Sequence, residues 1–197
     1  VREGLRRWPI PSFCSWLGEL CMRSLRSRLY YHLMRWQLAK SRQTNRSIEA
    51  IRAGGEKSSG ELGKLPKGIQ VERTTIEGLE AEWLRPSDCR DSALLLYLHG
   101  GAYVSGSIVT HRRLAAKLAA AARTSTLTLG YRLAPENPFP AAVDDALQCY
   151  LALRASDPGA SIAIAGDSAG GGLAVALCLR LRDGGFETPA ALALLSP

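Results

Sequence analysis

The segment 164–172 constrains the fold of this chain more than any other stretch. It consists of Ile-Ala-Gly-Asp-Ser-Ala-Gly-Gly-Gly, with Ser168 flanked by a glycine two positions away on each side. An apolar run enters the segment and a helical run of small residues leaves it, which is typical of a sharp turn from a strand into a helix. Such a turn requires a positive φ at the serine and no side chains at the two glycines. The pattern predicts an exposed serine hydroxyl at a helix N-terminus, where free N–H groups favour negative charge.

From residue 93 onward, short apolar runs alternate with helical patterns. A hairpin is expected to precede them over 69–83, where apolar and polar positions alternate around a Glu-Gly turn. Because βαβ crossovers are right-handed, this order predicts an α/β fold with a mostly parallel sheet and helices on both faces. Functional residues are then expected at the carboxyl ends of the strands. Strands are predicted at 93–98, 124–129, 162–165 and 190–195, and helices at 111–122, 140–153 and 169–182.

The first third of the chain differs from the rest in charge and pattern. Residues 1–69 carry 14 Lys and Arg against 5 Asp and Glu, whereas residues 70–197 carry 11 against 13. Apolar residues spaced three and four apart predict amphipathic helices over 10–40. The polar, Gly- and Ser-rich stretch 41–64 is predicted to be a loop or linker, with one helical turn near 48–51. We interpret the basic residues as a solvated helical face, so no nucleic-acid partner is expected.

The residue content and spacing predict no metal site, disulfide framework, membrane span or cofactor motif. The five cysteines include no C-x-x-C pair, and no two of the three histidines have helical ligand spacing, so neither a metal site nor a disulfide framework is predicted. We interpret the cysteines as reduced thiols of a cytoplasmic protein. No run of about 18 apolar residues is present, and the broken apolar stretch 10–21 does not resemble a signal peptide. Glycine patterns for phosphate or dinucleotide binding are also absent, so no organic cofactor is predicted.

A second glycine turn follows the predicted strand 93–98. It consists of His99, Gly100, Gly101 and Ala102, and its backbone amides are suited to holding an oxyanion. The alternative is an ordinary Gly-Gly turn with a hydrogen-bonded histidine. In lipases and esterases, a loop of this kind supplies one half of an oxyanion hole, and the amide after the nucleophile supplies the other. Two such turns in this chain order favour acyl transfer over the alternative.

These motifs resemble the hormone-sensitive-lipase-like family of α/β-hydrolases, in its bacterial esterase and lipase branch. The resemblance covers 69–197 as the N-terminal part of a catalytic domain. Segment 1–68 is similar only in kind, as an N-terminal helical cap segment and linker. The motifs that carry the resemblance are His99-Gly100-Gly101-Ala102, Tyr131-Arg132-Leu133-Ala134-Pro135-Glu136, Phe139-Pro140-Ala141-Ala142 with Asp144-Asp145, and Gly166-Asp167-Ser168-Ala169-Gly170-Gly171.

The resemblance implies the α/β-hydrolase fold and hydrolysis of small carboxylic esters through an acyl-enzyme. Ser168 would be the nucleophile, and its hydroxyl would attack the ester carbonyl. His99 would brace the oxyanion loop without acting as the base. No metal or organic cofactor is needed, and no stable membrane insertion is expected. The remaining implied site residues are Gly100, Gly101 and Ala169 as oxyanion donors and Asp167 as a supporting residue.

The sequence departs from the family pattern after the serine. The family order is serine, then Asp or Glu, then histidine, yet no histidine follows Ser168 and the only acids are Asp183 and Glu187. We therefore expect a fold that is incomplete at the C-terminus, with an exposed apolar edge at 190–195 and weak or absent hydrolysis. His111 is expected to be a solvent-exposed residue at a helix start. The alternative function is a non-catalytic protein that binds a small ligand on the same scaffold.

Overall fold

The computed structural model describes residues 29, 31–33, 35, 47–61 and 64–197. The chain divides into two compact units, Val1–Arg46 and Ser47–Pro197. The helices predicted over 10–40 lie outside the described residues, except that 29, 31–33 and 35 are helical. All the elements below belong to the second unit.

The second unit is built on a six-stranded sheet of order β1-β2-β4-β3-β5-β6. The predicted hairpin is confirmed, because β1 pairs antiparallel with β2, which in turn pairs antiparallel with β4. The four neighbouring strands β4, β3, β5 and β6 are parallel to one another, as the alternating pattern predicts. The strands are β1 (Ile69–Ile76), β2 (Leu79–Pro86), β3 (Arg90–Leu98), β4 (Thr124–Leu129), β5 (Ser161–Asp167) and β6 (Ala191–Leu195), and the helices are α3 (Ile48–Glu61), α4 (Ile108–Ala122), α5 (Ala141–Ser156) and α6 (Ala169–Asp183).

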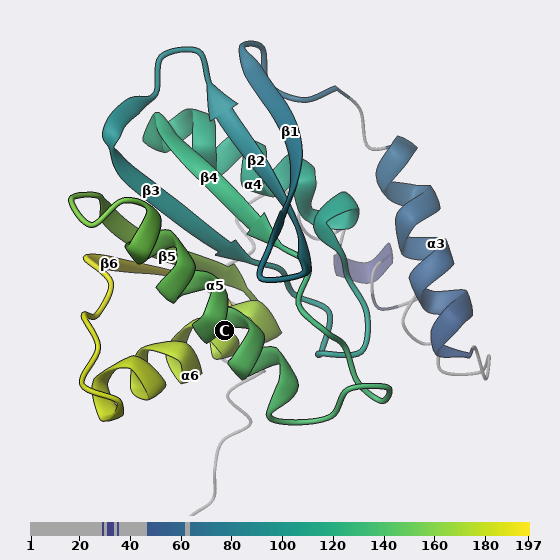
Figure 1. The fold of residues 1–197 in the computed structure, drawn as a ribbon. Helices are drawn as coiled ribbons and strands as arrows, with labels where there is room; N and C mark the ends of the chain where they lie inside the picture. Colours follow the sequence, from purple (N-terminus) through teal and green to yellow (C-terminus); the bar gives the residue numbers. More distant parts are fainter. Residues whose placement is uncertain (1–28, 30, 34, 36–46, 62–63) are drawn as a thin grey trace, which may run out of the picture. The chain divides into compact units, whose positions relative to one another are not determined.

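Helices cover both faces of the sheet, as Figure 1 shows with α5 and α6 on one side and α4 on the other. Successive residues of β3 supply the two cores, because side chains alternate between the faces of a strand. Leu96 and Leu98 pack in the core beneath α5 and α6, whereas Leu95 and Tyr97 pack against the alanines of α4. The predicted layers are therefore confirmed, and the parallel strands all point toward the end of the sheet where the glycine turns follow.

Helix α3 corrects the prediction of a loop over 41–64. Ser47 begins it, because its hydroxyl accepts a hydrogen bond from the amide of Ala50 at 3.3 Å. The glycine pair in the middle lowers the helix propensity of this stretch. However, one of those glycines, Gly55, faces α4, since a Cβ there would lie at ordinary contact distance, 3.6 Å, from Thr110 Cγ2. Tertiary packing outweighs the local preference on which the prediction relied.

The edge strand β6 confirms the expected apolar edge. It pairs with β5 on one side only. Leu192 and Leu194 are 42% and 38% exposed. In the part of the chain that the structure describes, this strand is therefore the least covered part of the sheet.

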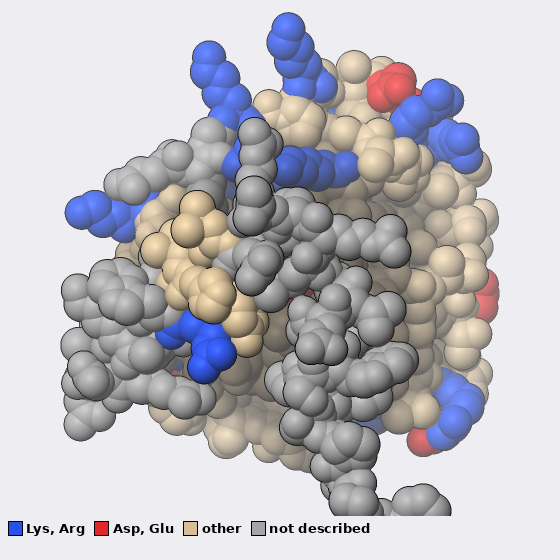
Figure 2. Space-filling model, turned by 180° about the vertical axis from the view of Figure 1, so that it is seen from behind, with Lys and Arg blue, Asp and Glu red and all other residues tan. Residues whose placement is uncertain are grey.

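On the face in Figure 2, described Lys and Arg side chains lie at several separate places, most of them toward the upper part of the view, and Asp or Glu side chains stand beside some of them. None of the helices in the described ranges combines the length and hydropathy that a membrane crossing requires.

We expect opposite effects from adding a methyl group at two glycines. A Cβ at Gly170 would collide with the carbonyl oxygens of Leu98 and His99, whereas a Cβ at Gly54 has no atom within 4 Å. Gly170→Ala should lower the free energy of unfolding by about 3 kcal/mol or more, because backbone must move apart. Gly54→Ala should raise it by about 0.5 to 1 kcal/mol through helix propensity. Urea denaturation followed by circular dichroism measures both, and a Gly170→Ala protein as stable as the parent would contradict this packing.

Candidate active site

Ser168 occupies the predicted turn between β5 and α6. Its φ of 49° and ψ of −123° confirm the positive φ that the motif requires. A side chain at Gly166 would collide with the carbonyl of Gly170, so the two glycines allow the turn to close. The Ser168 amide donates to Leu195 O at 2.9 Å and ties the turn to β6. The strained serine is thus fixed by its neighbours on both sides.

The serine side chain is exposed and sits at the start of α6. Among the described residues, no hydrogen bond involves its hydroxyl. The amides of Gly171 and Gly172 donate to Ser168 O at 2.9 and 3.1 Å and close the first helical turn. The amide of Ala169 precedes these bonds and has no acceptor among the described residues. It is therefore free to donate to a ligand beside the hydroxyl.

The second glycine turn lies beside the first because of strand register. Leu98, the last residue of β3, pairs with Gly166 of β5, so the chain leaves both strands at the same edge. The amides of Val104 and Ser105 both donate to Gly101 O, at 3.1 and 2.9 Å. Within this tight turn, φ is positive at Gly101 (126°), at Ala102 (56°) and at the following tyrosine (61°). The structure brings together the two segments that the sequence singled out.

The amide of Gly100 is already engaged, which argues against its predicted role as an oxyanion donor. It donates to Asp167 Oδ1 at 3.0 Å. A Cβ at Gly100 would also meet Asp167, so glycine is needed for this close approach. The next two amides, of Gly101 and Ala102, have no acceptor among the described residues. The sequence could not reveal this difference, since Asp167 reaches Gly100 only through strand pairing.

Asp167 is held as a carboxylate beneath the two turns. Burial alone would raise its pKa, but hydrogen bonds from His111 and Tyr97 outweigh burial and lower the pKa to about 2. The Tyr97 hydroxyl donates to Oδ1 at 2.5 Å, and His111 Nε2 lies 3.5 Å from Oδ2. Asp167 therefore links β3, β5 and α4 through one charged group, consistent with the supporting role implied for it.

His99 is buried and uncharged. It is 2% exposed, and its ring stacks on Tyr131 at 4.3 Å between ring centroids. Its Nδ1 lies 2.8 Å from Gly100 O, and because a carbonyl only accepts, this nitrogen carries the hydrogen. Burial lowers the pKa of His99 to about 4. These contacts are suited to a residue that holds the oxyanion loop in place.

His111 differs from its predicted place at a solvent-exposed helix start. Helix α4 begins earlier, at Ile108, where Ser107 and Thr110 form a capping box. His111 consequently stands in the first turn, with its side chain 21% exposed and directed at Asp167. Its ring also stacks on that of His99, with 5.4 Å between centroids. Sequence reasoning missed this pairing, because Thr in place of Glu or Gln hides the capping box.

The loop after β4 supports the oxyanion loop. The Tyr131 hydroxyl donates to His99 O at 2.6 Å, and the Ala134 amide donates to Tyr103 O at 2.8 Å. The guanidinium of Arg132 pairs with the second residue of the Asp144-Asp145 motif, since it lies 2.6 Å from Asp145 Oδ1. Asp145 is 1% exposed, so this ion pair fixes the loop from within the core.

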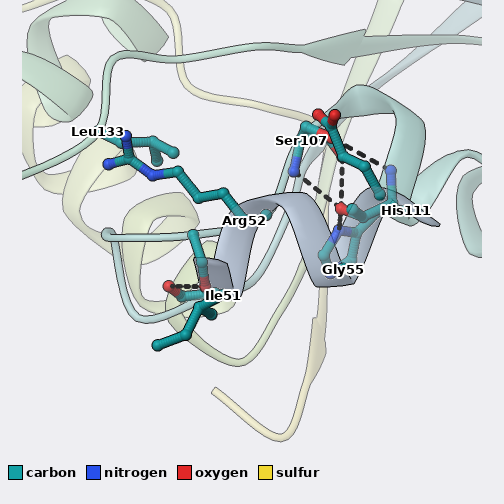
Figure 3. A pocket seen from close by; sticks show the side chains of 11 residues that line it. Ile51, Arg52, Gly55, Ser107, His111 and Leu133 are labelled. Atoms are coloured by element: carbon teal, nitrogen blue, oxygen red, sulfur yellow. Dashed lines mark hydrogen bonds between the residues drawn. The ribbon is translucent and has the colours of Figure 1, made fainter. Parts of the chain in front are cut away.

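A cavity of about 430 Å³ opens beside the oxyanion loop. Figure 3 shows its lining side chains, which come from α3, from the start of α4 and from the loop after β4. Gly101 and His111 place it next to the groups described above. Among the described residues, no cluster of three or more His, Cys, Asp or Glu side chains is arranged to hold a metal ion. The residues that line the cavity are Ile51, Arg52, Gly55, Glu56, Gly101, Ser105, Gly106, Ser107, Thr110, His111 and Leu133.

Comparisons with known proteins match the same part of the chain. An acetyl-hydrolase of Streptomyces hygroscopicus is 43% identical over 165 residues, which are 83% of this chain and 53% of that protein. An esterase of Acinetobacter venetianus is 35% identical over 130 residues, or 66% of this chain and 43% of that protein. The crystal structure of an esterase from the bacterial hormone-sensitive lipase family superposes with a TM-score of 0.74 at 42% identity, and covers 80% of this chain and 53% of that one.

The chain thus spans about half the length of the relatives that it matches. Residues 95–197 match the family described by the α/β-hydrolase fold, and this stretch contains both glycine turns. The fold, the strained serine and these matches agree. The chain belongs to the α/β-hydrolase fold family, and its structural relatives there are esterases of the bacterial hormone-sensitive lipase group.

Proposed function

We propose that this chain carries the nucleophile and the oxyanion site of a serine carboxylic ester hydrolase. The observation that carries the proposal is the exposed Ser168 at φ 49°, beside a glycine turn with unbonded amides. The names of the relatives, acetyl-hydrolase and esterase, support the same reaction. The strain at Ser168 is typical of a functional residue, because a serine that only caps a helix needs no positive φ.

In this reaction, Ser168 Oγ attacks the carbonyl carbon of an ester. Negative charge develops on the carbonyl oxygen, and amides that already point at that position stabilise it. We propose the amides of Gly101, Ala102 and Ala169 for this role, in place of the engaged Gly100. The tetrahedral adduct then expels the alcohol, which takes up the proton that the base removed from the Ser168 hydroxyl. Water hydrolyses the remaining acyl-enzyme to the carboxylic acid and the free serine. The family order places the histidine base after the serine, so the proposal assigns only the nucleophile and the oxyanion donors to this chain.

The substrate proposed is a small ester with a short acyl or alcohol group. The cavity beside Gly101 has a volume of about 430 Å³, within the range of small-molecule sites. Its walls combine apolar side chains such as Ile51 and Leu133 with a few polar groups. Since Ile51 belongs to α3, we also propose that segment 1–68 contributes the cap.

We further propose a cytoplasmic location. The free thiols of Cys89, Cys149 and Cys178 support it.

Labelling with a fluorophosphonate tests the nucleophile. We expect the reagent to modify Ser168 slowly, as located by mass spectrometry of peptides. The adduct occupies the same oxyanion site as an ester, but the histidine base of the family order is not among the residues assigned here. Ser168→Ala should abolish the modification and any hydrolysis of p-nitrophenyl acetate. Ser161→Ala changes an exposed serine at the start of β5, the strand that leads to Ser168. This variant should behave as the parent.

Hydrolysis that persists in Ser168→Ala would contradict the proposal. So would a parent protein in which the reagent modifies other serines, such as Ser161, while Ser168 stays unmodified and p-nitrophenyl esters bind. The second result favours a ligand-binding protein on this scaffold.

The neutral state of His99 predicts a loss of stability in mild acid. Its ordinary pKa of 6.5 falls to about 4 in the folded chain, so the unfolded state takes up the proton first as the pH falls. The stability that neutral His99 provides is complete above pH 6.5 and is lost as the pH approaches 4. The free energy of unfolding should fall by roughly 3 kcal/mol over this window because of His99. Urea denaturation at a series of pH values measures it.

His99→Gln should flatten this part of the pH profile, since its amide can still donate to Gly100 O but does not titrate. His32→Gln alters an exposed histidine and should leave the profile unchanged. Parallel profiles for the parent and His99→Gln would show that His99 is not held neutral. Asp167 does not confuse the test, because its pKa of about 2 places its contribution at lower pH.

A further inference from the structure

We propose that Arg52 of α3 is a positioning residue that holds the oxyanion loop in its working conformation. The inference rests on the proposed function, because it assigns a role in the same reaction. Arg52 lies in the stretch predicted to be a loop or linker, so sequence reasoning did not consider it.

The guanidinium of Arg52 joins three segments. Its Nε donates to Val104 O at 2.8 Å, and one terminal nitrogen donates to Ala134 O at 2.9 Å. Both terminal nitrogens also donate to the carboxylate of Glu136, each at 2.9 Å. Only a planar fork of donors can reach two carbonyl groups and a carboxylate together. Figure 3 shows the side chain extending from α3 toward the segment that holds Leu133.

Two of these bonds support the loop that carries two of the proposed oxyanion donors. Val104 closes the turn that contains Gly101 and Ala102, because its amide donates to Gly101 O at 3.1 Å. Ala134 is bonded at both ends, with its carbonyl accepting from Arg52 and its amide donating to Tyr103 O at 2.8 Å. Arg52 therefore cross-links the oxyanion loop to the loop after β4.

The oxyanion loop depends on such support because its backbone is strained. Ala102 and Tyr103 have φ values of 56° and 61°, in a region that residues with a Cβ rarely adopt. Two successive residues of this kind persist only where surrounding contacts hold them. Displacing the amides by even a fraction of an ångström weakens oxyanion stabilisation, since the donors must meet the oxygen at hydrogen-bond distance.

An ordinary surface ion pair would not explain this arrangement. The side chains of Arg52 and Glu136 are 28% and 51% exposed, and exposed pairs contribute little to stability. We interpret Glu136 as the group that orients the guanidinium toward the two carbonyls. Arg180 provides a contrast, because its pair with Asp144 joins two exposed side chains at 3.1 Å and involves no loop of the site.

Hydrogen exchange measured by NMR tests the proposal without requiring turnover. The amides of Val104, Ser105 and Ala134 are bonded within the supported loops and are the reporters. In Arg52→Gln and Arg52→Lys, we expect them to exchange about tenfold faster, as for the loss of a charge-assisted hydrogen bond. Lysine keeps the charge but not the fork. Amides in β3 and β5 should keep the exchange rates of the parent.

The fluorophosphonate reaction provides the second readout. We expect the rate of Ser168 labelling to fall about tenfold in both Arg52 variants, since the donors are misplaced. Arg180→Gln should match the parent in both measurements. Glu136→Gln should show a smaller change of the same kind, because both carbonyl contacts remain.

Unchanged exchange at the three reporters in Arg52→Gln would overturn the proposal, whatever the labelling rate. Faster exchange spread evenly over β3, β5 and α6 would overturn it too, because Arg52 would then stabilise the whole domain. A parent in which the reagent labels other serines but not Ser168 would reject the proposed function, yet the exchange measurement would still decide whether Arg52 holds the loop.

Discussion

The parallel pairing of β3 with β5 is the constraint on which the site depends. It places Leu98 opposite Gly166, so that two glycine turns leave the sheet side by side. The first turn can approach the second only because Gly170 has no side chain to meet the Leu98 carbonyl. The Asp167 carboxylate then bonds to the Gly100 amide across the gap. The contact between these two turns therefore fixes both the nucleophile and the oxyanion loop in place.

Around the two turns, the titratable side chains support the backbone, whereas the strained backbone positions carry the proposed chemistry. Asp167 is kept ionised by its hydrogen-bond donors, whereas His99 is kept neutral by burial. Both groups hold the backbone and neither is free to react. Positive φ values occur instead at Ser168 and in the turn at Ala102, the positions assigned to attack and to oxyanion binding. Rigid support around strained functional residues is a general way to pre-organise a site.

Local patterns predicted the parts of the fold that local patterns determine. The turn at Ser168 and the βα alternation follow from spacing and glycine placement, and the structure confirms both. Helix α3 was missed because its glycines and serines lower helix propensity, while contacts with α4 and the Arg52 hydrogen bonds stabilise it. The engagement of Gly100 and the approach of His111 to Asp167 depend on strand register and on a helix start three residues earlier. No motif in the sequence encodes such pairings across elements.

We propose the amides of Gly101, Ala102 and Ala169 as the oxyanion donors, with the Gly100 amide committed to Asp167. Amide proton chemical shifts measured before and after phosphonylation of Ser168 test it most directly. We expect downfield shifts for the three donors, as the adduct oxygen accepts their hydrogen bonds, and an unchanged shift for Gly100. A downfield shift at Gly100, with Gly101 and Ala102 unchanged, would contradict it.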